Sequence, residues 1–358
     1  MPTTVDALER ACGQKIGKRQ VEGLAAAAAV DFKTFYTTRQ PPSSAPGDVL
    51  VLSADGKGIV MRPDALRAAT RKAAEGSEAK LGSRLSKGEQ RGRKRMAEIG
   101  AVYDITPTAR SPGDVMASHD DLEKVPAPVA SGKWLTASAD DDAATVVAEI
   151  FEEAERRDPD HTRTWIALVD GNTHQFDRIR AEARDRGVNV PVVIDFIDVL
   201  EYLWTAAWSF HDEGDPDAEV WVADKAVAVL EGCARQIAAG IRRRATSHRH
   251  TKPPKRINAD RCATYLTNKA NYLDYPTALT SGWPIATGII EGACRHLVED
   301  RMDLTGARWI LNGAEAILKL RALRSNGDFD DYWNLHLAAE HQRIHRTRYA
   351  NNLTPQAS

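Results

Sequence analysis

The chain has 358 residues, 42% of them hydrophobic, which is enough to form one large domain or two. Its 48 Lys and Arg nearly balance its 50 Asp and Glu, so the net charge of -2 neither demands nor forbids a polyanionic partner. The four cysteines form no C-x-x-C pair, which argues against zinc ribbons and thioredoxin-like motifs and is typical of a reducing cytoplasm. No stretch approaches the roughly 20 apolar residues of a membrane span, and no signal peptide is recognisable, so we expect a cytoplasmic protein without a membrane partner.

The chain begins with a helical segment, residues 1–40, and a proline-rich linker, Pro41 to Gly47. A buried strand, a tight glycine turn and a second strand are predicted within residues 49–62, because an apolar run bounded by turn residues is typical of a central strand. The segment 63–98 is mostly helical in propensity and strongly charged, and a third strand, residues 99–105, follows it.

Residues 106–142 carry four prolines and scattered acids, which predicts a long loop. A helix at 143–157, a fourth strand at 165–170, a second helix reaching residue 186 and a fifth strand at 190–195 come next. The first three strands would form an antiparallel meander and the last two parallel additions, with the first and fourth strands as neighbours. This order predicts an α/β fold with a mixed five-stranded sheet and flanking helices.

From Phe196 onward the apolar spacing becomes helical, which predicts an all-α insertion, residues 198–286. A basic segment broken by prolines, residues 242–256, lies inside it. The expected helices of the insertion and of the chain after it are 196–208, 216–244, 258–272, 288–302, 314–323 and 328–348.

Three acidic residues stand at special places in this layout. Asp55 ends the first strand, Asp170 ends the fourth, and Glu291 opens a helix after the insertion. Because the first and fourth strands are expected to be neighbours, the three carboxylates could converge at the rim of the sheet. Clustered carboxylates repel one another unless cations lie between them, and hard oxygen ligands suit Mg²⁺ or Mn²⁺. Two such ions, about 3.5–4 Å apart, can activate a water or a 3′-hydroxyl for attack on a phosphodiester.

Each acid also has a purely structural interpretation. Asp55 before a glycine is typical of ordinary turns, and Asp170 would cap the helix that follows it. Glu291 would form an i, i+4 ion pair with Arg295. The nearby acids that rival Glu291 as the third member are Glu299 and Asp303.

The stretch 288–296 reads GIIEGACRH, and the two aspartates stand in SADGKG at 53–58 and ALVDG at 167–171. Together with residues 300–309 and 320–325, these motifs resemble bacterial insertion-sequence transposases of the DDE class, most closely the ISKra branch. The resemblance extends over nearly the whole chain, and the Glu motif is its most specific part.

The resemblance implies an RNase H-like catalytic domain, interrupted by the all-α insertion, in a transposase that cleaves DNA and transfers its strands. It implies that Asp55, Asp170 and Glu291 are the catalytic residues and hold two Mg²⁺ (or Mn²⁺) ions. Its partners would be DNA, as transposon ends and target, and further copies of this chain in a homo-oligomer. The corresponding segments are an N-terminal helical segment and linker (1–47), the first part of the core (48–197), the insertion (198–286), the Glu-bearing helices (287–326) and a C-terminal helix and tail (327–358).

Two features depart from the family. Family members carry a histidine shortly after the fifth strand, where this chain has Asp198. They also have a longer N-terminal region that recognises the ends of the element.

Two basic segments, 84–95 and 242–256, suit a DNA partner because Lys and Arg neutralise phosphates. In the first, six cations against one Glu give a net charge of +5. A solvated charged surface is the alternative for both. The candidate DNA-binding residues are Arg91, Arg93, Lys94, Arg95, Arg242, Arg243, Arg244, Lys255 and Arg256.

Two other functions stay open. A catalytically impaired, truncated remnant of a transposase would bind DNA in a salt-sensitive way without cutting it. A phosphotransferase of the sugar-kinase type, which shares an RNase H-like core, would require Gly-rich phosphate loops, and the sequence shows none of the expected kind.

Overall fold

A five-stranded mixed sheet lies at the centre of the molecule, with the strand order β3-β2-β1-β4-β5. The computed structural model describes residues 9–10, 13–14, 16–75, 94–118, 120–171, 173–247, 253–304 and 307–346. β1 pairs antiparallel with β2 and β2 with β3, whereas β1 and β4, and β4 and β5, pair in parallel. The strands are β1 Val49–Val60, β2 Lys94–Ile105, β3 Ala130–Ser138, β4 Trp165–Val169 and β5 Val192–Ile194.

This sheet confirms the expected α/β layout with five strands. As predicted, three antiparallel strands precede two parallel ones, one helix precedes β4 and another follows it along the chain, and β1 and β4 are neighbours. All five residues of β4 are buried, as a strand between two parallel neighbours requires when helices cover both of its faces. However, the predicted second strand is part of β1, and β3 lies where a loop was predicted.

The predicted hairpin within residues 49–62 is wrong, because β1 is one strand of 12 residues. Gly56 and Gly58 pair with β2 instead of turning the chain. A Cβ on Gly56 would lie 3.0 Å from the Met96 side chain, and one on Gly58 would lie 2.8 Å from that of Lys94. The glycines therefore make room for side chains of the neighbouring strand, and Asp55 lies inside β1 rather than at its end.

β2 and β3 also depart from the predicted elements. β2 begins at Lys94, within the segment expected to be helical, and β3 lies within the predicted loop. β3 occupies the edge of the sheet, where the amide side chain of Asn326 donates to the carbonyl oxygen of Leu135 at 3.0 Å and accepts from its N–H at 2.9 Å. This contact protects an exposed strand edge that the local sequence of β3, with its serine, glycine and lysine, does not mark as a strand.

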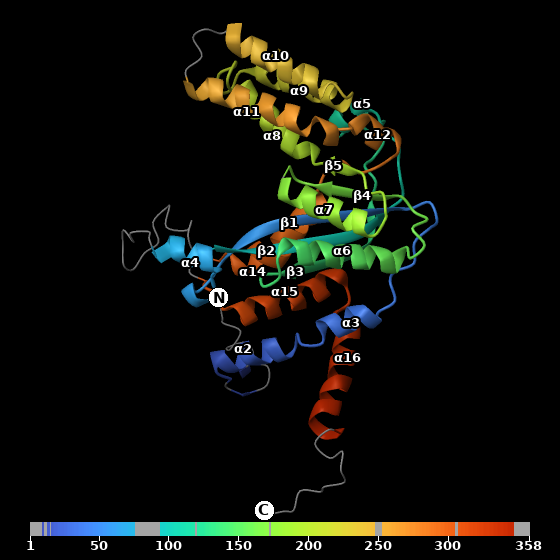
Figure 1. Cartoon of the computed structure of the whole chain (residues 1–358), viewed down its shortest axis with the longest axis vertical. Helices are drawn as coiled ribbons and strands as arrows, with labels where there is room; N and C mark the ends of the chain where they lie inside the picture. The colour runs from blue at the N-terminus through green and yellow to red at the C-terminus, as the bar shows by residue number, and fades with distance from the viewer. Residues whose placement is uncertain are drawn as a thin grey trace, which may run out of the picture.

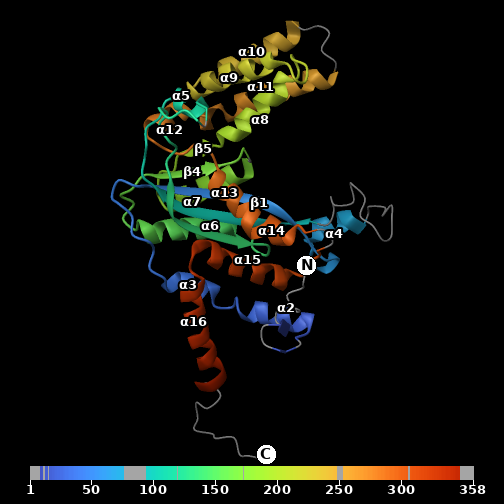
Figure 2. The ribbon, with the colours of Figure 1, turned by 180° about the vertical axis from the view of Figure 1, so that it is seen from behind.

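Helices cover both faces of the sheet (Figures 1 and 2). α6 and α7 lie on one face, where a Cβ on Gly100 would come within 2.7 Å of Ile150 of α6. α13 and α14 lie on the other face, and α15 packs against β3. These helices are α6 Ala143–Arg157, α7 Thr173–Asp185, α13 Gly288–Ala293, α14 Asp300–Met302 and α15 Leu311–Asn326, and a π-helical turn, Cys294–Glu299, joins α13 to α14.

The insertion is helical, as predicted, and stands beyond β5 at one end of the molecule (Figure 1). The single helix expected at 216–244 is wrong: it is divided, because Gly232 adopts a φ of +86° that ends α9. The insertion helices are α8 Phe196–Ala207, α9 Pro216–Leu230, α10 Ala234–Ser247, α11 Pro253–Lys269 with a 3-10 turn at Ala270–Tyr272, and α12 Tyr275–Thr280.

Most of the remaining helices lie at the end opposite the insertion or beside the ends of the strands, whereas α5 lies beside α9 of the insertion (Figure 1). The helix expected over residues 1–40 is two helices, α2 and α3, in the described part of the chain. These remaining elements are α2 Lys18–Ala27, α3 Phe32–Thr38, a 3-10 turn at Pro63–Ala65, α4 Ala68–Glu75, α5 Pro112–Met116, and α16 Phe329–His341 with a π-helical turn at Gln342–Arg346.

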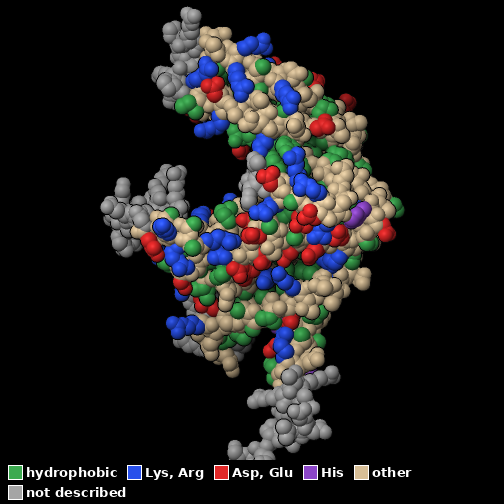
Figure 3. Space-filling model, in the orientation of Figure 1, with side chains coloured by type: hydrophobic (Ala, Val, Ile, Leu, Met, Phe, Trp, Pro, Cys, Tyr) green, Lys and Arg blue, Asp and Glu red, His purple; other side chains and the backbone are tan. Residues whose placement is uncertain are grey.

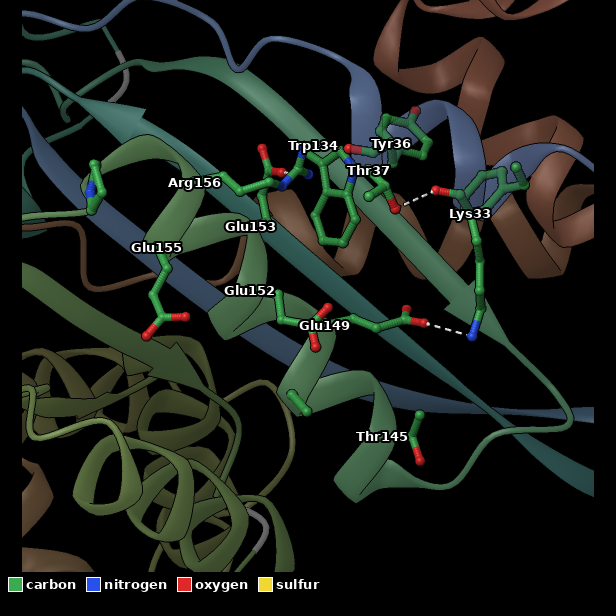
Figure 4. A pocket seen from close by; sticks show the side chains of 13 residues that line it. Lys33, Tyr36, Thr37, Trp134, Thr145, Glu149, Glu152, Glu153, Glu155 and Arg156 are labelled. Atoms are coloured by element: carbon green, nitrogen blue, oxygen red, sulfur yellow. Dashed lines mark hydrogen bonds and ion pairs between the residues drawn. The ribbon is translucent and has the colours of Figure 1, made fainter.

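A hollow of about 670 Å³ lies between α3 and α6 (Figure 4). Its carboxylates are largely paired within the protein: Glu149 lies 3.4 Å from the Lys33 ammonium, and Glu153 forms an ion pair with Arg156. The hollow therefore offers a surface whose charges are already compensated, and it does not hold the three predicted acids.

Candidate functional site

The register of the neighbouring parallel strands β1 and β4 relates Asp55 to Asp170. Residues of β1 and β4 that pair, such as Leu52 and Ala167, are 115 positions apart in sequence, and Asp55 and Asp170 have the same separation (170 − 55). Carried three residues past this pair, the register places Asp170, the first residue after β4, beside Asp55. Paired residues of parallel strands point to the same face and their strands lie about 4.8 Å apart, so we infer that the two carboxylates share one face of the sheet.

The start of α13 is fastened to the end of β5. The carboxylate of Asp195, which follows β5, accepts hydrogen bonds from the N–H and the hydroxyl of Thr287, the residue before α13. The other oxygen of Asp195 accepts the Ile197 N–H at 2.7 Å and so caps α8. Asp195 and Thr287 are buried, and the Thr287 hydroxyl also lies 3.2 Å from Glu291. The buried Asp195 therefore fixes the start of α13, the helix that bears Glu291.

Cys294 brings the Glu291 helix into direct contact with Asp55. Its thiol donates to Asp55 Oδ2 at 3.1 Å, and Asp55 Oδ1 accepts the Gly56 N–H at 2.6 Å. Burial, and then the negative charge of Asp55, raises the pKa of the Cys294 thiol, so it stays protonated as a donor. Cys294 follows Glu291 by three residues, which places both on one side of the helix.

The two rival acids and Arg295 each form an ion pair. Glu299 pairs with Lys57, whose pKa is raised first by this hydrogen bond, and Asp303 lies 3.6 Å from Lys94. The two other candidates for the third acid are thus ion-paired with lysines of β1 and β2. In the described part of the chain, Arg295 pairs with Asp300, at 3.9 Å, and not with Glu291 as its structural interpretation expected.

The three predicted acids come from distant segments of the chain: Asp55 lies in β1, Asp170 directly after β4, and Glu291 on α13. Among the described residues, no three His, Cys, Asp or Glu side chains are grouped so as to hold a metal ion. Glu291 is exposed, and Asp55 and Asp170 are half-buried. Their carboxylate oxygens are the ligands that Mg²⁺ prefers, so the donor chemistry suits the ion that the sequence predicts.

Asp198 lies at the same end of β4. Its carboxylate accepts the Gly171 N–H at 3.1 Å and so fixes the turn that follows Asp170. Burial raises the pKa of Asp198 to about 6, and the nearby charges of Asp195 and Asp170 act in the same direction. Asp198 is therefore part of the acidic surroundings of Asp170.

The predicted DNA-binding residues have different surroundings. Arg91 and Arg93 lie outside the described residues. Arg95 is buried and donates to the carbonyl oxygens of Ala139 and Ala65, at 2.5 and 3.1 Å, which leaves its guanidinium little surface for a phosphate. Lys94 is half-buried beside Asp303.

The candidates in the insertion lie at its surface, where Figure 3 shows Lys and Arg side chains spread over the helical block. Arg242 and Arg243 are exposed on α10, and Arg244 stacks 4.5 Å from the centroid of the Phe210 ring. Two others are paired with acids: Lys255 lies 3.3 Å from Asp212, and Arg256 lies 2.8 Å from Asp260.

Sequence reasoning singled out the three acids as candidates but missed Asp195, Thr287 and Cys294, which fasten the Glu291 helix to β5 and to Asp55. The position of Asp195 directly after a strand, as for Asp170, was the available signal. Neither a known family model nor a curated protein matches this chain. Within the described residues, every helix is too short or too polar to cross a membrane.

Proposed function

We propose that this protein is a transposase of the DDE class, which cuts and joins DNA with an RNase H-like catalytic domain. Two observations support the proposal, the register of β1 and β4 and the hydrogen bond between Cys294 and Asp55. Asp170 follows β4 in register with Asp55 of β1, and the helix that bears Glu291 is bonded to Asp55 through Cys294. The DNA ends and the target would bind as partners of a homo-oligomer, with Arg242 and Arg243 as exposed phosphate contacts.

Asp55, Asp170 and Glu291 would hold two Mg²⁺ ions, which stabilise the charge that develops on a phosphodiester and lower the pKa of a bound water or hydroxyl. Because like charges repel, the three carboxylates would converge only when cations bind between them. The Asp195–Thr287 contact and the Cys294 thiol would hold the Glu291 helix against β5 and β1 while the ions bind.

Nicking of supercoiled plasmid DNA in Mg²⁺ or Mn²⁺ tests this proposal. Asp55→Asn, Asp170→Asn and Glu291→Gln should each reduce nicking to background while leaving the circular dichroism spectrum unchanged. Asp303→Asn is the matched control, because Asp303 lies near the same helix and pairs with Lys94. A triad variant that nicks as fast as Asp303→Asn would refute the assignment.

A DNA-binding remnant is the second candidate, and one observation favours it. Both oxygens of Asp55 already accept hydrogen bonds, from Gly56 and Cys294. Among the described residues, no group of three acidic, His or Cys side chains that could hold a metal ion is found. Absence of nicking by the wild type in Mn²⁺, together with DNA binding that weakens steeply with salt, would select this function.

A further inference from the structure

A cavity of about 590 Å³ lies between α8, α11 and the turn after β4, beside Asp170. Ligand sites of roughly 300–1,000 Å³ accommodate small molecules, so its volume suits a single nucleotide. The cavity is not explained by the triad, because Asp55 and Glu291 do not line it. Its own walls must therefore indicate what it binds.

The two walls carry opposite charges. Arg261, Tyr265 and Lys269 are spaced by four residues along α11, so they share one side of that helix. On the α8 wall, Asp198 and Glu201 present carboxylates three residues apart. Arg261 and Glu201 are both exposed, and neither forms an ion pair within the described part of the chain.

Two tyrosines join the walls and fix the shape of the cavity. The rings of Tyr202 on α8 and Tyr265 on α11 stack with centroids 3.9 Å apart and planes inclined by 15°. Gly171 forms the floor, where any Cβ would meet Tyr265 Cε2 at 2.9 Å. The stacked rings and the close approach of the Gly171 backbone thus fix the shape of the cavity. The two tyrosines line it and provide an aromatic surface for a sugar or a base.

A nucleotide matches these walls better than a simple ion does. Its phosphate requires cations, which α11 supplies, and the exocyclic amino group of its base requires an acceptor, which the carboxylates of α8 supply. An inorganic anion would leave the acids unused. A metal ion would leave the exposed Arg261 guanidinium unused.

We propose that this cavity holds one unpaired nucleotide of the DNA strand next to Asp170, with its phosphate on Arg261 and Lys269 and its base amino group on Glu201. The inference rests on the proposed function, since it takes DNA to be the substrate. It adds that the site prefers, at one position, a base with an amino group over one without. Cytosine and thymine provide the sharpest comparison, because they carry an amino group and a carbonyl oxygen at the same ring position.

Fluorescence anisotropy of the full chain in EDTA tests the inference, with a labelled duplex that ends in a one-nucleotide flap of dC or dT. Wild type should bind the dC flap about tenfold more tightly than the dT flap. Glu201→Ala should remove this preference. Arg261→Ala should weaken both flaps and reduce the salt dependence of binding by the equivalent of about one phosphate contact.

Arg235→Ala is the matched control, because Arg235 lies on α10 and donates to Asn271 at 2.8 Å, and it does not line the cavity. It should keep the full preference for dC. Equal binding of the two flaps by wild type, or a preference that survives Glu201→Ala, would overturn the inference. Free dCMP that competes as strongly as the flap would show that the ligand is a soluble nucleotide and would overturn the assignment to a strand.

The two proposals fail separately. If Asp55→Asn still nicks plasmid DNA but the dC preference is present, the catalytic triad is wrong and the cavity stands. If Asp55→Asn abolishes nicking but wild type binds both flaps equally, the cavity assignment is wrong and the triad stands.

Discussion

Gly171 tolerates no side chain at the turn after β4. A Cβ would lie 2.9 Å from Tyr265 Cε2 and 3.0 Å from its hydroxyl, and the Tyr265 ring cannot move away freely because it stacks on Tyr202. Gly171→Ala should therefore lower the free energy of unfolding by about 1–3 kcal/mol, as overpacking does, measured by urea denaturation. Gly240→Ala is the control, because nothing lies within 4 Å of its Cβ position on α10; it should be neutral or add up to about 1 kcal/mol. Equal stability of the two variants would contradict the packing argument.

Glycine also shows where prediction from sequence fails at the scale of single residues. Gly56 and Gly58 follow an apolar run, a pattern that is typical of a turn. Their actual role depends on Met96 and Lys94, which lie on a strand almost forty residues further along. Nothing near the glycines identifies those neighbours, so the local pattern predicts a hairpin where the fold requires space.

At the scale of elements, strong and local patterns were predicted correctly. β4 and β5 are short apolar runs, and α6 shows regular helical spacing. β3 escaped prediction because its stability comes from pairing with β2 and from Asn326, which is 191 residues away from Leu135. The division of α9 from α10 depended on one glycine, Gly232, in an otherwise helical pattern.

The contact between the start of α3 and α16 predicts a pH dependence of stability. Asp31 accepts hydrogen bonds from Arg343 at 2.8 and 2.9 Å and pairs with His336 at 2.7 Å, and the Arg343 bond lowers the pKa of Asp31 to about 2. A carboxyl with a lowered pKa in the folded state stabilises the protein above its unfolded pKa of about 4, and this contribution is lost as the pH falls toward 2.

Asp31→Asn should therefore cost about 1.5–3 kcal/mol of unfolding free energy at pH 7, the usual range for a hydrogen bond to a charged group. Urea denaturation should show the difference from wild type shrinking as the pH drops below about 4. Asp64→Asn, in the 3-10 turn after β1, is the control, and its stability should follow wild type. A loss for Asp31→Asn that is the same at pH 3 as at pH 7 would rule out the ion pair as its cause.

At the scale of the molecule, the candidate site depends on contacts that span the chain. Asp195 bonds a residue 92 positions away, and Cys294 bonds one 239 positions away. The sequence singled out Asp55, Asp170 and Glu291 as candidates because each stands in a recognisable motif. It could not identify Thr287 or Cys294 as the connections, because their role appears only when the helix after the insertion packs against β1.

Because the proposed ligands come from β1, from the end of β4 and from α13, a bound cation would link three separate elements of the fold. Ligand that binds only the native state adds RT ln(1 + [L]/Kd), about 2.7 kcal/mol at a hundred times Kd. Ca²⁺, which prefers the same oxygen ligands, should therefore raise the melting temperature of wild type without any DNA present. Asp170→Asn and Glu291→Gln should abolish most of this shift, whereas Glu299→Gln, which removes only the partner of Lys57, should retain it. A shift that persists in both triad variants would place the cation elsewhere, and the nuclease proposal would lose its metal site even if the protein binds DNA.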